Sequence, residues 1–380
     1  MESAENKNKK GPARWKAAAA AVITLLLIAA AVLVFVYRDY LSASGLRELF
    51  GKDGGTEQTG EAFSYESGSV QSFATGGNFL AVASSTGLQL LDGDGKTAAR
   101  QVFSMTNPAC AASEVLFAFY DVGSTVLRVC DRDGTIHNMD TEGSIISLSM
   151  NGSGYMAVIT EETGYKGLVT VYDASLTPVY EWYSGTGYAL FAEVSPDNKS
   201  LAVSCAASDG GTVHLFSLAS ETEKAAVTSE SELFLQMHWF TGDRICVLSE
   251  QRALFLTADG REKASVDFEG MYLTDYCFES TDFITLYLGK YRTGTSGVLV
   301  NLDSGGEELG RAEVQGDLLS LSISGDRLGV LYSDRAVLYS RAMAESGTYE
   351  DTLGVKRMLL RKKGDALLLS SFFAERYSFR

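Results

Sequence analysis

The chain has 380 residues and a formal net charge of −16, which divides into +3 over the first 16 residues and −19 over the rest. A domain this acidic repels phosphate backbones, which argues against a nucleic-acid partner. Glycine is abundant (38 residues), proline is rare (4) and 11% of the residues are aromatic, a composition typical of many short strands joined by turns.

The N-terminal region predicts a membrane anchor. Residues 1–16 are polar and basic, and residues 17–37 are uncharged and long enough to cross a lipid bilayer as a signal-anchor helix. Because the basic flank precedes the helix, we expect a single-pass protein of the cell membrane with a cytoplasmic N-terminus and an extracytoplasmic domain. The alternative is a cleaved signal peptide, whose apolar region is usually only about 7–15 residues long. Residues 38–60, polar and rich in glycine toward their end, predict a juxtamembrane linker.

Residues 61–380 are dominated by a repeated unit in which a polar turn leads into a short apolar run. Eight such runs begin 36 to 45 residues apart, at Leu80, Leu116, Met156, Leu201, Ile245, Ile284, Leu328 and Leu367. This period is that of a four-stranded propeller blade. Short apolar runs bounded by turn residues indicate strands buried on both faces, here the second strand of each blade. We therefore expect one all-β domain, an eight-bladed β-propeller.

The most complete turn reads S-P-D-N-K-S-L-A-V, from Ser195 to Val203. It resembles the S-P-D-G-x-x-[LI]-A-[FV] signature of WD40-like and TolB-type propeller repeats. The other seven units keep the turn and the apolar strand but lack the Pro-Asp pair. With its N-terminal helix, the whole chain resembles membrane-anchored propeller families of unknown function from Gram-positive bacteria. That resemblance implies a topology and no activity.

The last unit has room for only three strands, at 355–360, 366–370 and 373–379. Residues 61–67 could supply the missing fourth strand, and joining both ends of the chain in one blade would close the ring without a free edge. A seven-bladed ring is possible if the weak second unit, residues 107–140, is absorbed into its neighbours.

Such a closure brings the linker to the face that carries the turns between strands 1 and 2 and between strands 3 and 4 of each blade. We expect that face to point toward the bilayer. The first turn of the last blade holds the densest basic cluster of the acidic domain, Arg361, Lys362 and Lys363. This cluster predicts contact with anionic headgroups. The alternative is an ordinary solvated turn.

The usual signals of chemistry are missing. The sequence contains no phosphate-binding loop, dinucleotide fingerprint, zinc-protease motif or hydrolase elbow. Turns at Asp92 and Asp131 lack the further oxygen ligands of a calcium loop. The five cysteines fall in or beside apolar strands and include no C-x-x-C pair, so we expect buried free thiols. We predict no catalytic residue, no metal and no cofactor.

The opposite face offers the best candidate for binding. Three connections between strands 2 and 3 are lengthened in the sequence, at 161–167, 206–211 and 289–297. Tyrosine and arginine are favoured in binding surfaces, and loops on a rigid scaffold often carry function. The alternative is length variation among solvated loops. The predicted binding residues are Tyr165, Lys166, Lys290, Tyr291 and Arg292.

These features predict a non-catalytic binding or scaffolding module for a protein, a peptide or a cell-wall ligand. The alternative is an extracytoplasmic enzyme, a metal-assisted hydrolase or lyase with its site in the central channel. Such an enzyme needs carboxylates and histidine from neighbouring innermost strands, and Glu193, His238 and Asp275 are the candidates. Convergence of their side chains on one ion, at about 2–2.5 Å, would favour the enzyme.

Overall fold

The computed structural model describes residues 62–66, 68–293, 295–361 and 365–379. The predicted tail, anchor helix and linker, residues 1–60, lie outside the described residues, as do Lys362 and Lys363. Within the described ranges, no helix has the length and apolar character that crossing a membrane requires.

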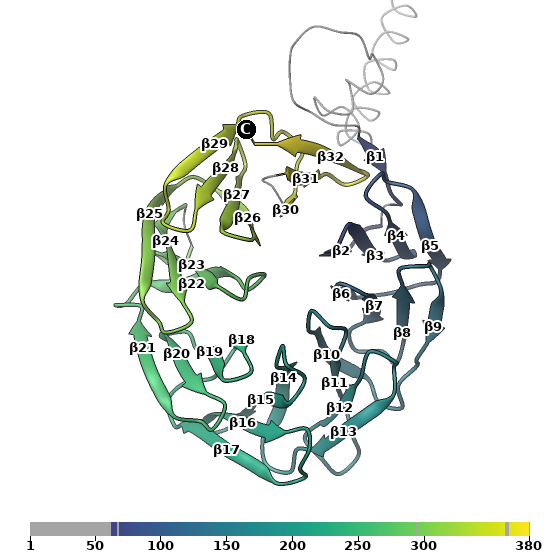
Figure 1. Cartoon of the computed structure of the whole chain (residues 1–380), viewed down its shortest axis with the longest axis vertical. Coiled ribbons are helices and arrows are strands. Elements are labelled where there is room, and N and C mark those ends of the chain that lie inside the picture. The colour runs from purple at the N-terminus through teal and green to yellow at the C-terminus, as the bar shows by residue number, and fades with distance from the viewer. Residues whose placement is uncertain (1–61, 67, 294, 362–364, 380) are drawn as a thin grey trace, which may run out of the picture. The chain divides into compact units, whose positions relative to one another are not determined.

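Eight four-stranded antiparallel sheets follow one another around a ring, as Figure 1 shows. Blade 1 contains β2 (Gln71–Gly76), β3 (Phe79–Ser84), β4 (Gly87–Leu91) and β5 (Thr97–Val102). Blade 2 contains β6 (Pro108–Ala112), β7 (Leu116–Asp121), β8 (Leu127–Asp131) and β9 (Ile136–Asn138). Blade 3 contains β10 (Ile145–Met150), β11 (Met156–Thr160), β12 (Leu168–Tyr172) and β13 (Pro178–Tyr183). Blade 4 contains β14 (Tyr188–Val194), β15 (Ser200–Ala207), β16 (Gly210–Ser217) and β17 (Glu223–Ser229).

The second half of the ring repeats this pattern. Blade 5 contains β18 (Gln236–Thr241), β19 (Arg244–Leu248), β20 (Arg252–Thr257) and β21 (Glu262–Asp267). Blade 6 contains β22 (Tyr272–Cys277), β23 (Phe283–Gly289), β24 (Ser296–Asp303) and β25 (Glu308–Gln315). Blade 7 contains β26 (Leu318–Ser324), β27 (Arg327–Tyr332), β28 (Ala336–Ser340) and β29 (Glu345–Tyr349). Blade 8 contains β30 (Arg357–Leu360), β31 (Asp365–Leu369), β32 (Phe373–Ser378) and β1 (Phe63–Ser64).

The predicted eight-bladed propeller is confirmed, and each of the eight apolar runs forms the second strand of its blade. The seven-bladed alternative is wrong, because the weak unit at 107–140 folds as a complete blade, β6–β9. The second strands are almost wholly buried, since neighbouring blades cover both of their faces. β7 and β23, for example, are buried along their whole length.

The core is divided among the contacts between blades. Each of the eight interfaces holds its own cluster of buried apolar side chains. Trp239, for instance, packs between blades 4 and 5 together with Ile245 and Phe234. Burial of this kind stabilises a fold by roughly 25 cal/mol per Å² of apolar surface. It therefore holds every blade to both of its neighbours.

Side chains shape the polar turns. In the most complete one, Asn198 adopts a left-handed φ of 59°, and its backbone N–H donates to Ser195 O at 3.0 Å. In the turns predicted at Asp92 and Asp131, the aspartate Oδ1 accepts hydrogen bonds of 2.9–3.0 Å from backbone N–H groups two and four residues later. This use of the carboxylate is the one expected of a turn residue.

The fourth strand of blade 8 comes from the beginning of the domain. Phe63 pairs with Ala374 and Ser64 with Phe373, so β1 lies beside β32. Tyr65 then donates its hydroxyl to Ser370 O at 2.6 Å and is buried against the core shared by blades 8 and 1. The two ends of the propeller are thus joined in one sheet (Figure 1).

All five cysteines are free. Cys110 and Cys130 lie on the first and third strands of blade 2, with β7 between them. Burial raises the pKa of Cys110 to about 11 and that of Cys130 to about 12. Both side chains therefore remain protonated, apolar packing groups.

Candidate binding surfaces

The two faces of the ring differ in which connections they carry. Here the distal face is the one with the connections between strands 2 and 3 of each blade and between successive blades. The proximal face has the turns between strands 1 and 2 and between strands 3 and 4, and β1 begins on that side. Each innermost strand therefore starts at the distal face and ends at the proximal face.

Four innermost strands have a β-bulge at their distal end. The pairing of first and second strands skips one residue in blades 3, 4, 6 and 7. The skipped residues are Ile146, Leu190, Thr274 and Leu319. A bulge leaves one residue outside the ladder and changes the direction of its side chain, and bulges are frequent beside functional sites. In this propeller they lie around the distal mouth of the central channel.

Large apolar side chains are exposed at the same mouth. Five residues at or just before the start of innermost strands in blades 4 to 7 form what we call the channel-mouth patch. They are Tyr188, Leu190, Leu235, Tyr272 and Leu319, each between 37% and 59% exposed. Leu235 and Tyr272 line one cavity, and exposed apolar side chains gathered at one place are typical of interaction sites. Two members of the patch, Leu190 and Leu319, are bulge residues.

The predicted distal residues of blade 3 reach this patch. The Lys166 Nζ lies 4.6 Å from the ring centroid of Tyr188 and 3.2 Å from its hydroxyl oxygen. Tyr165 packs against Tyr183, with ring centroids 4.9 Å apart. The 161–167 connection thus lies beside the channel-mouth patch.

The predicted residues of blade 6 lie on another side of the same patch. The Arg292 guanidinium lies 5.5 Å from the ring centroid of Tyr272. Lys290 forms an ion pair with Glu313 at 3.1 Å, and Tyr291 is 68% exposed. Arg292 is therefore placed beside a patch residue.

The expectation for residues 206–211 needs correction. β15 continues to Ala207 and β16 begins at Gly210, so the strands pair through Ala207 and Gly210 and only two residues connect them. The extra residues of this unit lengthen the two strands and not the loop, because the β15–β16 pairing continues to Ala207 and Gly210. The hairpin still rises at the distal face.

Two cavities open at the distal face. One, of about 580 Å³, is lined by Arg292, Tyr272 and Leu235 together with the carboxylates of Glu250 and Asp267. The other, of about 810 Å³, is lined by residues that include Lys166, Tyr188, Thr212, Asp209 and Glu230. Each cavity therefore combines a patch tyrosine, one of the predicted basic residues and two carboxylates.

The channel residues considered for catalysis do not assemble into a metal site. Glu193 Oε1 lies 3.5 Å from His238 Nδ1, while His238 Nε2 is 2.7 Å from Ser280 O and the ring stacks on Phe278. Both ring nitrogens thus face partners, and His238 links blades 4, 5 and 6. Throughout the described ranges, no group of three or more His, Cys, Asp or Glu side chains could hold a metal ion.

Asp275, the third candidate, contacts neither of the other two in a hydrogen bond or ion pair among the described residues. Its Oδ1 accepts a hydrogen bond of 2.8 Å from the backbone N–H of Tyr276. Burial raises the pKa of this carboxyl, while that hydrogen bond and the charge of Arg357 act in the opposite direction.

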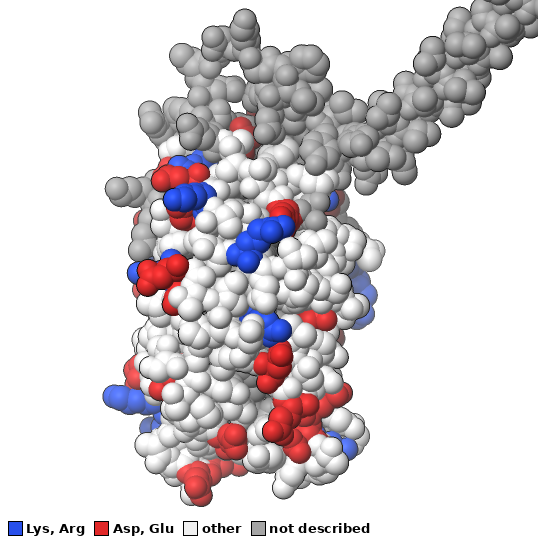
Figure 2. All heavy atoms as spheres, turned by 90° about the vertical axis from the view of Figure 1, so that its right-hand side faces the viewer, with Lys and Arg blue, Asp and Glu red and all other residues white. Residues whose placement is uncertain are grey.

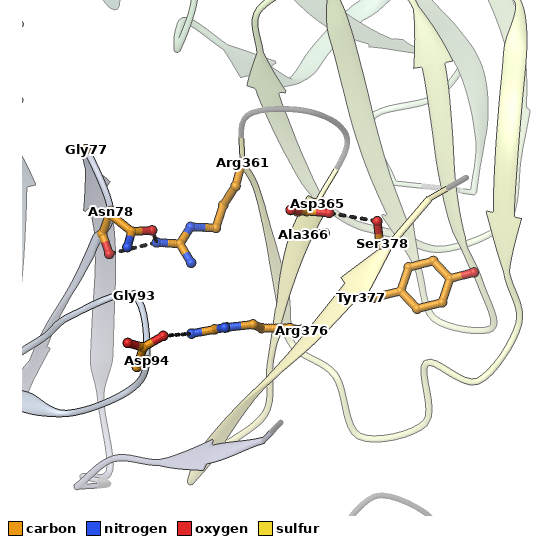
Figure 3. Close-up of a pocket in the computed structure, with 10 residues that line it drawn as sticks. All are labelled: Gly77, Asn78, Gly93, Asp94, Arg361, Asp365, Ala366, Arg376, Tyr377 and Ser378. Carbon is orange, nitrogen blue, oxygen red and sulfur yellow. Dashed lines mark hydrogen bonds and ion pairs between the residues drawn. The ribbon is translucent and has the colours of Figure 1, made fainter. Parts of the chain in front are cut away.

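At the proximal face, Arg361 lines a recess of about 600 Å³ between blades 8 and 1. Figure 3 shows Arg361 and Arg376 extending from blade 8 toward two turns of blade 1, at Gly77–Asn78 and Gly93–Asp94. Lys362 and Lys363, predicted with Arg361, lie outside the described residues. Sequence reasoning found Arg361 through its basic neighbours but missed Arg376, which lies in a strand.

One side of the outer wall carries charges of both signs. On the side of the ring that carries β5 and β9, acidic and basic side chains are interspersed and form no continuous basic stripe (Figure 2). A nucleic-acid interface would present such a stripe. This side of the molecule therefore combines charges of both signs.

Comparisons with known proteins give a family and a fold. Residues 56–366 match the family described as "Family of unknown function (DUF5711)". No curated protein matches the chain.

Similar solved structures include the C-terminal WD40 domain of Sif2 (TM-score 0.62, 10% identity, 85% of this chain and 99% of that one). They also include BamB from Moraxella catarrhalis (TM-score 0.57, 12% identity, 84% of this chain and 99% of that one). A third is the Swd1 β-propeller domain from Myceliophteria thermophila (TM-score 0.52, 10% identity, 73% of this chain and 96% of that one). At such identities the likeness shows the fold alone, and it bears out the resemblance to WD40-like propellers.

Proposed function

Because the chain belongs to the DUF5711 family, whose function is unknown, we propose a function from its geometry: a non-catalytic module that binds a protein or peptide at its distal face. The channel-mouth patch is the observation that carries this proposal. Tyrosine side chains give a large contact area with a polar end, and they dominate the energetics of many interfaces. The β-bulges at the distal ends of four innermost strands also support this proposal, because bulges are frequent beside functional sites.

The chemistry of the patch also describes the partner. Leucine and tyrosine side chains suit apolar anchor residues of a polypeptide. Carboxylates line both distal cavities, Glu250 and Asp267 in one and Asp209 and Glu230 in the other. Opposite charges across an interface steer association and suppress wrong partners. We expect the partner's apolar residues to be flanked by lysine or arginine.

The proposal also includes the location of the chain in the cell. Residues 17–37 would anchor the chain in the cell membrane with a cytoplasmic N-terminus, and the propeller would lie outside, with its distal face directed away from the bilayer. Alkaline extraction of membranes and protease accessibility in intact cells test this arrangement. Release of the full-length chain by alkali, or protection of the propeller from protease in intact cells, would contradict it.

The binding proposal is tested by crosslinking and pull-down from intact cells that express the chain. The patch variant carries Tyr188→Ala, Tyr272→Ala and Leu319→Ser. Its matched control carries Val102→Ala and Val179→Ala, which remove exposed apolar side chains from outermost strands. We expect a partner that the native chain and the control recover and that the patch variant loses.

A second triple variant, Lys290→Ala, Tyr291→Ala and Arg292→Ala, tests the loop of blade 6 on its own. Loss of the exposed Tyr291 ring and of the Arg292 side chain beside Tyr272 should weaken recovery of the same partner, because both offer contact area next to the patch. Recovery of an identical set of proteins by the native chain and the patch variant would show that the distal mouth is not the binding site.

A further inference from the structure

The proximal recess is polar and lies where the ring closes. Arg361 follows the first strand of blade 8, and Arg376 lies on its third strand. The opposite wall is the backbone of two turns of blade 1, at Asn78 and Gly93. A side chain at Gly93 would collide with the Asn78 amide, because an added Cβ would lie 1.8 Å from its Nδ2. Glycine at this turn therefore leaves room for the Asn78 amide, which lines the recess.

The two arginines differ in their hydrogen-bond partners. Arg361 Nη2 donates to the backbone oxygen of Asn78 at 2.7 Å and also to its side-chain oxygen. Arg376 Nη2 reaches Asp94 Oδ1 only at 3.4 Å, and its buried Nε has no hydrogen-bond partner. Asp94 is 93% exposed, and an ion pair with so exposed a carboxylate contributes little. Neither guanidinium is thus fully compensated, because Arg361 donates to neutral oxygens and Arg376 pairs with an almost fully exposed carboxylate.

The neighbouring charges act on Arg361 in both directions. Burial, followed by the positive charge of Arg376, lowers its pKa, while the carboxylates of Asp365 and Asp94 act in the opposite direction. The other carboxylate of the recess, Asp365, accepts a hydrogen bond from Ser378 Oγ at 2.7 Å (Figure 3). An anion placed between the two guanidinium groups would relieve their repulsion.

We propose that this recess binds a phosphate group, held between Arg361 and Arg376. Guanidinium groups match phosphate oxygens and bind them through paired, charge-assisted hydrogen bonds. Two such groups, one just after β30 and one on β32, suit a tetrahedral anion, whose oxygens point in several directions. A free phosphate and the phosphodiester of an anionic lipid share this chemistry. The site is independent of the distal binding proposal.

The test uses the purified full chain in a non-ionic, phosphate-free detergent, with two probes measured separately by calorimetry. The probes are inorganic phosphate and dihexanoyl phosphatidylglycerol. Arg376→Gln should weaken binding at least about tenfold, which corresponds to about 1.4 kcal/mol. The matched control is Arg311→Gln, an exposed arginine on the outermost strand β25 that pairs with Glu308.

A second variant separates loss of the site from loss of the fold. Asp94→Asn removes a competing negative charge from an almost fully exposed side chain, so it should tighten binding of either probe. Binding of both probes with these effects identifies a general phosphate site, and binding of the lipid alone identifies a headgroup site. The proposal is overturned if neither probe binds, or if Arg376→Gln binds as tightly as the native chain.

Discussion

At the scale of single residues, Asp275 shows how burial on an innermost strand disfavours the charged form of a carboxyl group. It lies on innermost strand β22, and burial raises its pKa above the ordinary value of 3.8. A raised pKa means that the folded chain binds this proton more tightly than the unfolded chain does. Stability is therefore lost as the pH rises from about 3.8 through the folded pKa, and the cost is complete above the folded pKa.

We therefore predict that Asp275→Asn raises the melting temperature at pH 7. Asparagine keeps an oxygen that can accept the Tyr276 N–H but has no charge to bury. The difference between the variant and the native chain should shrink as the pH falls and vanish below about 3.8. Thermal denaturation across this range checks the sign. A variant that melts lower than the native chain at pH 7 would show that the charge of Asp275 is stabilising, through Arg357.

At the scale of elements, the second strands were predictable and the bulges were not. The apolar runs that begin at Leu80 and Ile284 are recognisable because burial on both faces demands an unbroken apolar stretch. The bulges at Leu190 and Leu319 depend on one residue being skipped in a pairing, which no local pattern records. The sequence therefore predicted the loop residues Lys166 and Arg292, but it did not predict the channel-mouth patch beside which they lie.

The closing strand makes an element-scale prediction. β1 has only two residues, so its attachment depends on Tyr65, whose ring is buried beside Phe73 and whose hydroxyl binds Ser370 O. Tyr65→Ala should destabilise the propeller by about 3–5 kcal/mol, the usual cost of deleting a buried aromatic ring. Chemical denaturation measures it, with the exposed Tyr165→Ala as control. Equal midpoints for the two variants would mean that closure does not depend on this residue.

At the scale of the whole molecule, the period of the sequence predicted the ring because every blade must bury a similar apolar strand between its two neighbours. Eight interfaces with separate cores need eight similar apolar strands, and that similarity is visible in sequence. The recess between blades 8 and 1 is different, because it joins Arg376 to Asp94, residues 282 positions apart. Contacts of this kind follow from closure of the ring and have no local signal.

The ring also separates the two proposed sites, which leads to a prediction about the molecule as a whole. The channel-mouth patch lies at the starts of innermost strands, and the recess lies at the opposite ends, among the proximal turns. Substitutions at distant sites without shared partners usually have additive free energies, within about 0.3–0.5 kcal/mol.

A chain carrying both the patch substitutions and Arg376→Gln should therefore lose its partner as the patch variant does. It should also lose phosphate binding by the same factor as Arg376→Gln alone. Pull-down and calorimetry on one preparation check both. If Arg376→Gln by itself changed recovery of the distal partner, the two faces would be energetically coupled. The rigid interfaces between blades would then be transmitting a change at one face to the other, contrary to the independence that the geometry predicts.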